Sequence, residues 1–166
     1  MEIPNEVKKS AFNNLIKQGF VFRLRGDIPF ESEDYHVFAV LNFDPKTGDV
    51  LLLTNGTSQV EKQTNYLRRT HVDVEATTVI LEAGSYSFIT KPTLFNCNSV
   101  HTINIEDISF DNDDAKLIGN QLSQEDVDRL VNAALASDNV LPEYKKLIRP
   151  DVSNQKEEPD GNQSNE

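Results

Sequence analysis

The sequence predicts a mainly β protein of the α+β class, in which helices flank a small, antiparallel, barrel-like sheet. Three observations support this: short apolar runs recur at hairpin spacing, no helical pattern separates them, and helical periodicity appears near both ends of the chain. A length of 166 residues gives room for one domain, which we expect to span residues 1–150.

The helices expected at the two ends have recognisable boundaries. In the first, apolar residues recur at helical spacing between residues 7 and 16, Asn5 can cap the start, and Gly19 suits a left-handed C-terminal cap. In the second, residues 123–137, Ser123 and Asp126 are placed to form a capping box before a continuous apolar stripe. A third, short helix is expected after Pro142, since proline suits a first helical turn.

The strands are expected at residues 20–25, 36–43, 50–53, 77–82, 86–89 and 100–107. The turn at 44–49, with Pro45 and Gly48, makes a hairpin of the second and third strands. Both arms of this hairpin lack a polar face over most of their length, so we expect central strands that are covered on two sides.

Charge and composition restrict the possible partners and location. The chain has 27 acidic and 16 basic residues and a net charge of −11, which counts against a general nucleic-acid binder. Residues 151–166 are polar and acidic, with a single valine, and we expect a disordered tail. One cysteine, no signal peptide and no long apolar run predict a cytoplasmic protein without a membrane partner.

No residue spacing indicates a metal or cofactor site. The three histidines lack metal-ligand spacing, and the acidic residues between 106 and 114 lack the order of a calcium loop, so a solvated acidic loop is the better interpretation. Cys97 and His101 are four apart, about 13 Å along an extended strand, which is too far for a nucleophilic pair. We therefore expect a buried, inert cysteine.

Two polar segments are candidates for function. "TNGTSQ", residues 54–59, follows the third strand and is either a turn or a polar site on a rigid element. In an antiparallel pair the end of one arm lies beside the start of the other, which makes His36 and Thr57 expected neighbours. The second segment, 62–71, contains Lys62, Arg68 and Arg69 near Tyr66, and is either an exposed loop or a guide for a single nucleic-acid strand.

Five segments occur along the chain in this order: "GDI" (26–28), "HVFAVLN" (36–42), "VLLLTNGTSQ" (50–59), "VHTINIEDI" (100–108) and "LSQEDVDRLVNAAL" (122–135). Together they resemble the plan of the PemK/MazF family of toxins. The resemblance implies an SH3-like barrel, a homodimer, a cognate antitoxin as partner, and RNA cleavage without a metal or other cofactor. In that chemistry a ribose 2′-hydroxyl attacks the neighbouring phosphate, which requires a proton acceptor, a proton donor and positive charge.

The resemblance also implies roles for individual residues. Thr57 and Ser58 match the family's catalytic hydroxyl position, and the family's arginine position is occupied by His36 or, with a shift of one residue, by Val37. His36 could move a proton but lacks the guanidinium fork, so the positive charge must come from elsewhere. The candidate substrate-binding residues are Arg25, Gln59, Arg68 and Arg69. The alternative is a barrel without catalysis that binds a protein or a small polar ligand.

Overall fold

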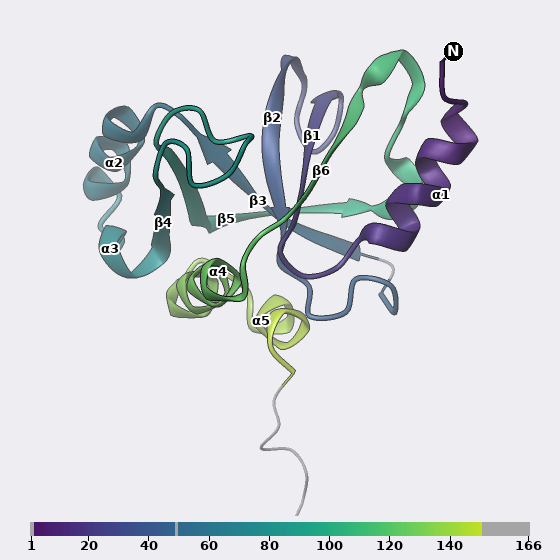
Figure 1. Ribbon diagram of the computed structural model, residues 1–166. Coiled ribbons are helices and arrows are strands. Elements are labelled where there is room, and N and C mark those ends of the chain that lie inside the picture. The colour runs from purple at the N-terminus through teal and green to yellow at the C-terminus, as the bar shows by residue number, and fades with distance from the viewer. Residues whose placement is uncertain (1, 49, 151–166) are drawn as a thin grey trace, which may run out of the picture.

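The computed structural model describes residues 2–48 and 50–150, and a six-stranded sheet forms its centre (Figure 1). The strand order is β4-β5-β3-β2-β1-β6, and all neighbouring strands are antiparallel. The predicted hairpin is confirmed, since β2 and β3 pair with Val40 opposite Leu53. The strands are β1 (Phe20–Gly26), β2 (Ser32–Val40), β3 (Val50–Thr57), β4 (Thr78–Leu81), β5 (Thr93–Asn104) and β6 (Ala115–Gln121).

Helices surround this sheet. In Figure 1, α1 lies on one side, α2 and α3 lie beside β4 on the other, and α4 and α5 lie below. Two single 3₁₀ turns, Ile105–Asp107 and Asp111–Asp113, connect β5 to β6. None of the helices in the described ranges is long and apolar enough to cross a bilayer. Their bounds are α1 (Asn5–Leu15), α2 (Val60–Arg69), α3 (Val74–Thr77), α4 (Gln124–Ala136) and α5 (Pro142–Ile148).

The sheet is buried on both faces, as the apolar hairpin arms predict. Side chains alternate along a strand, so Leu51 and Leu53 join one core while Leu52 joins the other. The first core contains Phe12 of α1 and Ile16, which directly follows that helix. The second core contains much of the apolar stripe of α4, which packs against the opposite face. The antiparallel sheet with helices at both ends of the chain is therefore confirmed.

The sheet is open rather than closed. β4 and β6 lie at opposite ends of the strand order and do not pair with each other in the described residues. The pairing of β3 with β5 shifts register between Thr54 and Gly56, so residues 97–99 form an irregular stretch within β5. The strand pairing of residues 2–48 and 50–150 thus gives an open sheet and does not confirm the SH3-like barrel that the resemblance implies.

Several elements differ from the sequence predictions. The strand expected at 100–107 is β5, which begins at Thr93 and ends at Asn104, and residues 105–107 form a 3₁₀ turn instead. The expected loop at 62–71 is mostly helix α2, whose polar sequence buries only Leu67 and so contains few apolar residues that could indicate a helix. The expected strand at 86–89 is irregular, because Phe88 and Ile89 enter a core without pairing to a strand. β6 was not predicted, because Gly119 and Asn120 within "AKLIGNQ" have the composition of a turn. The tail prediction falls on residues 151–166, outside the described part of the chain.

The helix starts are partly as predicted. Pro142 is at the first turn of α5, and the Ser123 hydroxyl accepts from the Asp126 amide at the start of α4, as expected. Asn5 is instead the first residue of α1, and its side chain donates to Asp111. The Ser123 backbone amide does not donate to the Asp126 carboxylate, because it donates to the Tyr86 hydroxyl instead. The carboxylate accepts hydrogen bonds from Tyr86 and Arg129.

Candidate functional site

His36 and Thr57 lie at adjacent ends of β2 and β3. Val37 is opposite Gly56 in the pairing, so His36 and Thr57 occupy the next position along the two strands. Directly opposite residues of an antiparallel pair share a face, which brings the two side chains together as the sequence predicted. The Ser32 hydroxyl lies 2.9 Å from His36 Nε2, and this hydrogen bond orients the imidazole.

A second imidazole, that of His101, lies on the same face. The ring of Phe30 contacts both histidines, with its centroid 4.9 Å from that of His36 and 5.4 Å from that of His101. His101 is opposite Leu53 on β5, and its ring is also 6.0 Å from that of Phe38. We call His36, His101, Phe30, Asn55 and Thr57 the histidine face.

His101 belongs to this site although the sequence pattern does not place it there. Spacing along the chain relates His101 to Cys97, four positions away in the same strand, and not to residues on other strands. The relevant neighbours are on β2 and β3, and the position of β5 beside β3 was the signal needed to find them. Burial lowers the pKa of His101, which favours the neutral, proton-accepting imidazole at neutral pH.

The polar segment at 54–59 is not a turn, because β3 continues through Thr57. Asn55 is opposite Phe38, and its Oδ1 atom is buried without a hydrogen-bond partner among the described residues. The Thr57 hydroxyl accepts from the amide of Gln59 at 3.2 Å, which helps to turn the chain from β3 into α2. Ser58 and Gln59 are exposed at this junction.

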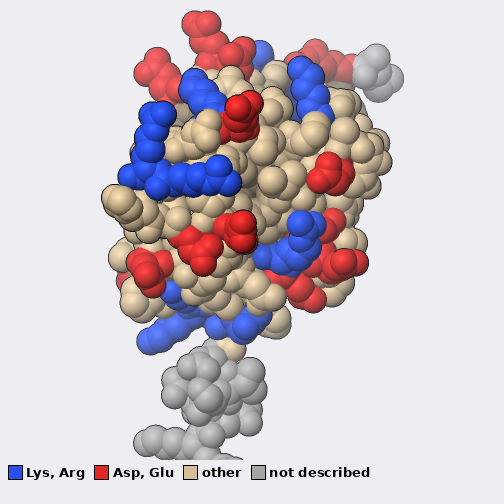
Figure 2. All heavy atoms as spheres, turned by 90° about the vertical axis from the view of Figure 1, so that its left-hand side faces the viewer, with Lys and Arg blue, Asp and Glu red and all other residues tan. Residues whose placement is uncertain are grey.

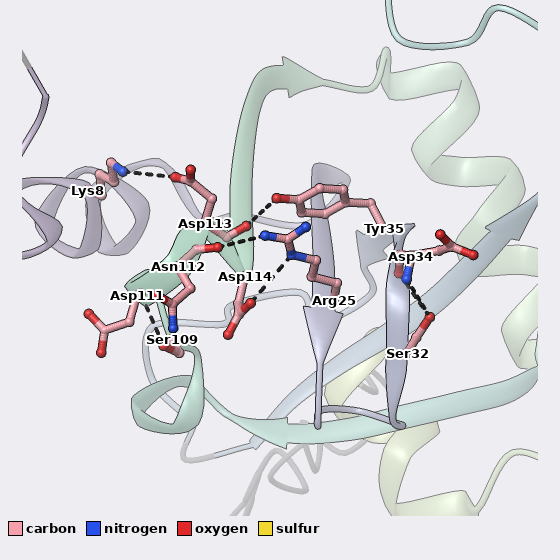
Figure 3. A network of polar contacts seen from close by, with 10 residues as sticks. All are labelled: Lys8, Arg25, Ser32, Asp34, Tyr35, Ser109, Asp111, Asn112, Asp113 and Asp114. Carbon is pink, nitrogen blue, oxygen red and sulfur yellow. Dashed lines mark hydrogen bonds and ion pairs between the residues drawn. The ribbon is translucent and has the colours of Figure 1, made fainter.

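None of the predicted arginines makes a hydrogen bond or an ion pair with the histidine face in residues 2–48 and 50–150. Arg25 hydrogen-bonds to Asn112 O at 2.8 Å and pairs with Asp114 at 3.5 Å (Figure 3). Leu24 is opposite His36, so its sequence neighbour Arg25 points to the other face of the sheet.

Arg68 and Arg69 are exposed in the last turn of α2, 11 and 12 residues beyond the end of β3 at Thr57. Glu61, Asp73 and Glu75 lie nearby in the sequence. Figure 2 views the molecule from the side that carries α2, and basic and acidic side chains are interspersed there. These two arginines therefore lie apart from His36 and do not form a uniform positive patch.

Metal and thiol chemistry have no support in the described residues. No group of three or more histidine, cysteine, aspartate or glutamate side chains in residues 2–48 and 50–150 is arranged to hold a metal ion. Burial raises the pKa of the Cys97 thiol to about 12, although its contact with Thr54 acts in the opposite direction. Cys97 is therefore protonated and unreactive, as predicted.

These features define an α+β protein with an open antiparallel sheet and a polar site on one sheet face. No protein-family model matches the chain, and a search of curated proteins gives no match. The functional assignment therefore depends on the site itself.

Proposed function

We propose that the protein is a metal-independent endoribonuclease of the PemK/MazF-like toxin type that cleaves single-stranded RNA in the cytoplasm. One observation carries this proposal: the imidazoles of His36 and His101 both contact the ring of Phe30, on the face where Thr57 ends β3. Two imidazoles can supply the proton acceptor and the proton donor that RNA cleavage requires.

In the proposed reaction the neutral His101 removes the proton from a ribose 2′-hydroxyl. The O2′–P bond forms and the P–O5′ bond breaks, which yields a 2′,3′-cyclic phosphate and a free 5′-hydroxyl. His36 in its protonated form donates to the leaving O5′, and the Ser32 hydroxyl orients its ring. The Thr57 hydroxyl hydrogen-bonds to the phosphorane, and the Phe30 ring stacks against a base.

The fold and partners that belong to this proposal are an opened SH3-like barrel, a homodimer and a cognate antitoxin. The six short antiparallel strands and the irregular stretch in β5 support the barrel relationship, since bulges accompany strong sheet curvature. The sequence resemblance supports the homodimer and the antitoxin.

The first test is cleavage of a single-stranded oligoribonucleotide by the purified chain in the presence of a chelator. We expect His36→Ala and His101→Ala each to lower kcat about 10²- to 10⁴-fold, the usual contribution of general acid–base catalysis. The control is His71→Asn, which alters the exposed third histidine at a position with φ of 62° that asparagine tolerates. Wild-type activity in both alanine variants would contradict the proposal, as would products without a cyclic phosphate.

The second candidate function is a binding module that lacks catalysis. The segment beside the histidine face favours it, because residues 27–34 contain Asp27, Glu31, Glu33 and Asp34. Such a surface repels RNA and attracts a basic protein segment or a small cation. This function predicts tight binding of a partner protein together with no RNA affinity at low salt, whereas salt-dependent RNA binding would argue against it.

A further inference from the structure

The opposite face of β1 carries a compact group of positive charges. Arg23 and Arg25 alternate with Leu24 on β1, and Arg23 is directly opposite Lys116 on β6. The Arg25 guanidinium and the Lys116 ammonium each lie 4.6 Å from the ring centroid of Tyr35, which comes from β2. We call Arg23, Arg25 and Lys116 the cation cluster.

Two acidic groups of the loop before β6 already have partners. Asp114 pairs with Arg25, and the Asp113 carboxylate pairs with Lys8 at 3.3 Å. The Tyr35 hydroxyl donates to the Asp113 carbonyl, so the ring between the cations is fixed to the same loop (Figure 3). The positions of Arg25 and Tyr35 are therefore set before any ligand arrives.

Arg23 and Lys116 remain without a counter-charge. Neither makes an ion pair or a hydrogen bond through its side chain within residues 2–48 and 50–150, and Arg23 is partly buried. Like charges directly opposite in an antiparallel pair are destabilising. No carboxylate in residues 2–48 and 50–150 forms an ion pair with Arg23, although the chain has 27 acidic residues.

Protection of the sheet edge accounts for only part of this arrangement. Lysine is common on edge strands, where it discourages pairing with other chains, and Lys116 is on the edge strand β6. Arg23 is on β1, between β2 and β6, where the sheet has no edge to protect. An unmatched guanidinium at an interior strand is suited to an anion supplied from outside, because its planar fork matches phosphate oxygens.

We propose that the cation cluster binds backbone phosphates of single-stranded RNA, at a site separate from the histidine face. The choice of RNA rests on the proposed function. The histidine face lacks a lysine or arginine contact in the described residues, so the substrate needs positive charge elsewhere on this acidic protein. Arg23 and Lys116 contact the phosphates directly, while Arg25 and Tyr35 hold the geometry of the cluster.

The test is binding of a 2′-O-methyl oligoribonucleotide, which cannot be cleaved, over a series of salt concentrations. Each phosphate contact contributes about 0.7 to the slope of log K against log salt for a single strand. We expect Arg23→Gln and Lys116→Gln each to reduce the slope by about this amount. The control is the double variant Lys17→Gln with Lys146→Gln, which removes two exposed positive charges elsewhere. Equal slopes in the double variant Arg23→Gln with Lys116→Gln and in this control would overturn the proposal.

Thermal unfolding with and without the oligonucleotide gives a second test. If Lys116 only protected the sheet edge, the shift in melting temperature caused by the oligonucleotide would not depend on Arg23 and Lys116. Arg23→Gln should raise the melting temperature of the free protein, because it removes the repulsion from Lys116. The oligonucleotide should raise the melting temperature of the wild type and not that of Arg23→Gln with Lys116→Gln. An equal rise in both proteins would contradict the site.

The two proposals fail in different ways. If His36→Ala cleaves normally while the salt slopes change as expected, the catalytic proposal fails and the phosphate site stands. If the slopes are unchanged while the histidine variants lose cleavage, the phosphate site fails and the catalytic proposal stands. Inorganic phosphate and a polyglutamate peptide serve as competitors. Displacement of the RNA by the peptide alone would show an acidic protein segment as the true ligand and overturn the proposal.

Discussion

His101 links the chemistry of the histidine face to the stability of the fold. Its ring packs between Phe30 and Phe38, and burial lowers its pKa. Protonation is therefore more costly in the folded protein than in the unfolded chain. The packing that keeps this imidazole ready to accept a proton also makes the fold sensitive to acid.

This sensitivity can be measured with His101→Gln. Because the folded pKa lies below the unfolded value of about 6.5, stability is fully present above pH 6.5 and is lost as the pH falls below it. We expect the wild type to lose stability as the pH falls below about 6.5, in a range where the variant changes less. Urea denaturation at several pH values measures this difference, and parallel pH profiles for the two proteins would contradict it.

At the scale of elements, a polar clamp connects the 82–90 segment to the start of α4. The Tyr86 hydroxyl donates to the Asp126 carboxylate at 2.6 Å and accepts from the Ser123 amide at 2.9 Å. Burial alone would raise the pKa of Asp126, but hydrogen bonds from Tyr86 and Arg129 and the charge of Arg129 hold that pKa below its usual value. Tyr86 thus takes the role at the helix start that the sequence suggested for Asp126.

Asp126→Asn should destabilise the protein by about 1 kcal/mol at pH 7, since it weakens charge-assisted hydrogen bonds. A lowered pKa stabilises the fold above the unfolded pKa of 3.8, and this contribution is lost as the pH falls through the folded value. The difference from wild type should therefore shrink below about pH 4. Asp128→Asn is the matched control on the same helix, because Asp128 is exposed and accepts only from Gln124. Equal loss of stability in both variants would count against the clamp.

The elements also show what the sequence could predict. Strong periodicity predicted α1, α4 and the β2–β3 hairpin, and the hairpin in turn placed His36 beside Thr57. Helix α2 and strand β6 contain few apolar residues, so their sequences alone gave too little pattern to predict them. The position of Arg25 was predictable in part. Alternation along the strand puts the Arg25 and Leu24 side chains on opposite faces of the sheet. Only the strand pairing shows that Leu24 is opposite His36.

At the scale of the whole molecule, the net charge of −11 opposes any approach of RNA. Residues 151–166 contribute five carboxylate side chains and one lysine to that charge. Their removal lowers the long-range repulsion while the core residues stay unchanged.

Truncation after Pro150 should therefore raise the affinity for single-stranded RNA several-fold at low salt and leave the melting temperature unchanged. Fluorescence anisotropy with a labelled oligonucleotide measures the affinity. A full-length chain in which the five acidic residues of the tail become amides separates charge from length, and should behave like the truncated protein. Unchanged RNA affinity in both proteins would limit these residues to a role in solubility.

The longest strand, β5, contributes to both cores. Phe95 and Cys97 near its start belong to the core that contains α4, and Ile103 near its end belongs to the core that contains α1. β5 hydrogen-bonds to β3 on both sides of the irregular stretch. If one core became disordered, β5 would lose part of this pairing, and the strands that line the other core would lose backbone hydrogen bonds as well. The two faces should therefore unfold in one cooperative transition, and the slowest-exchanging amides on both should report the same global opening.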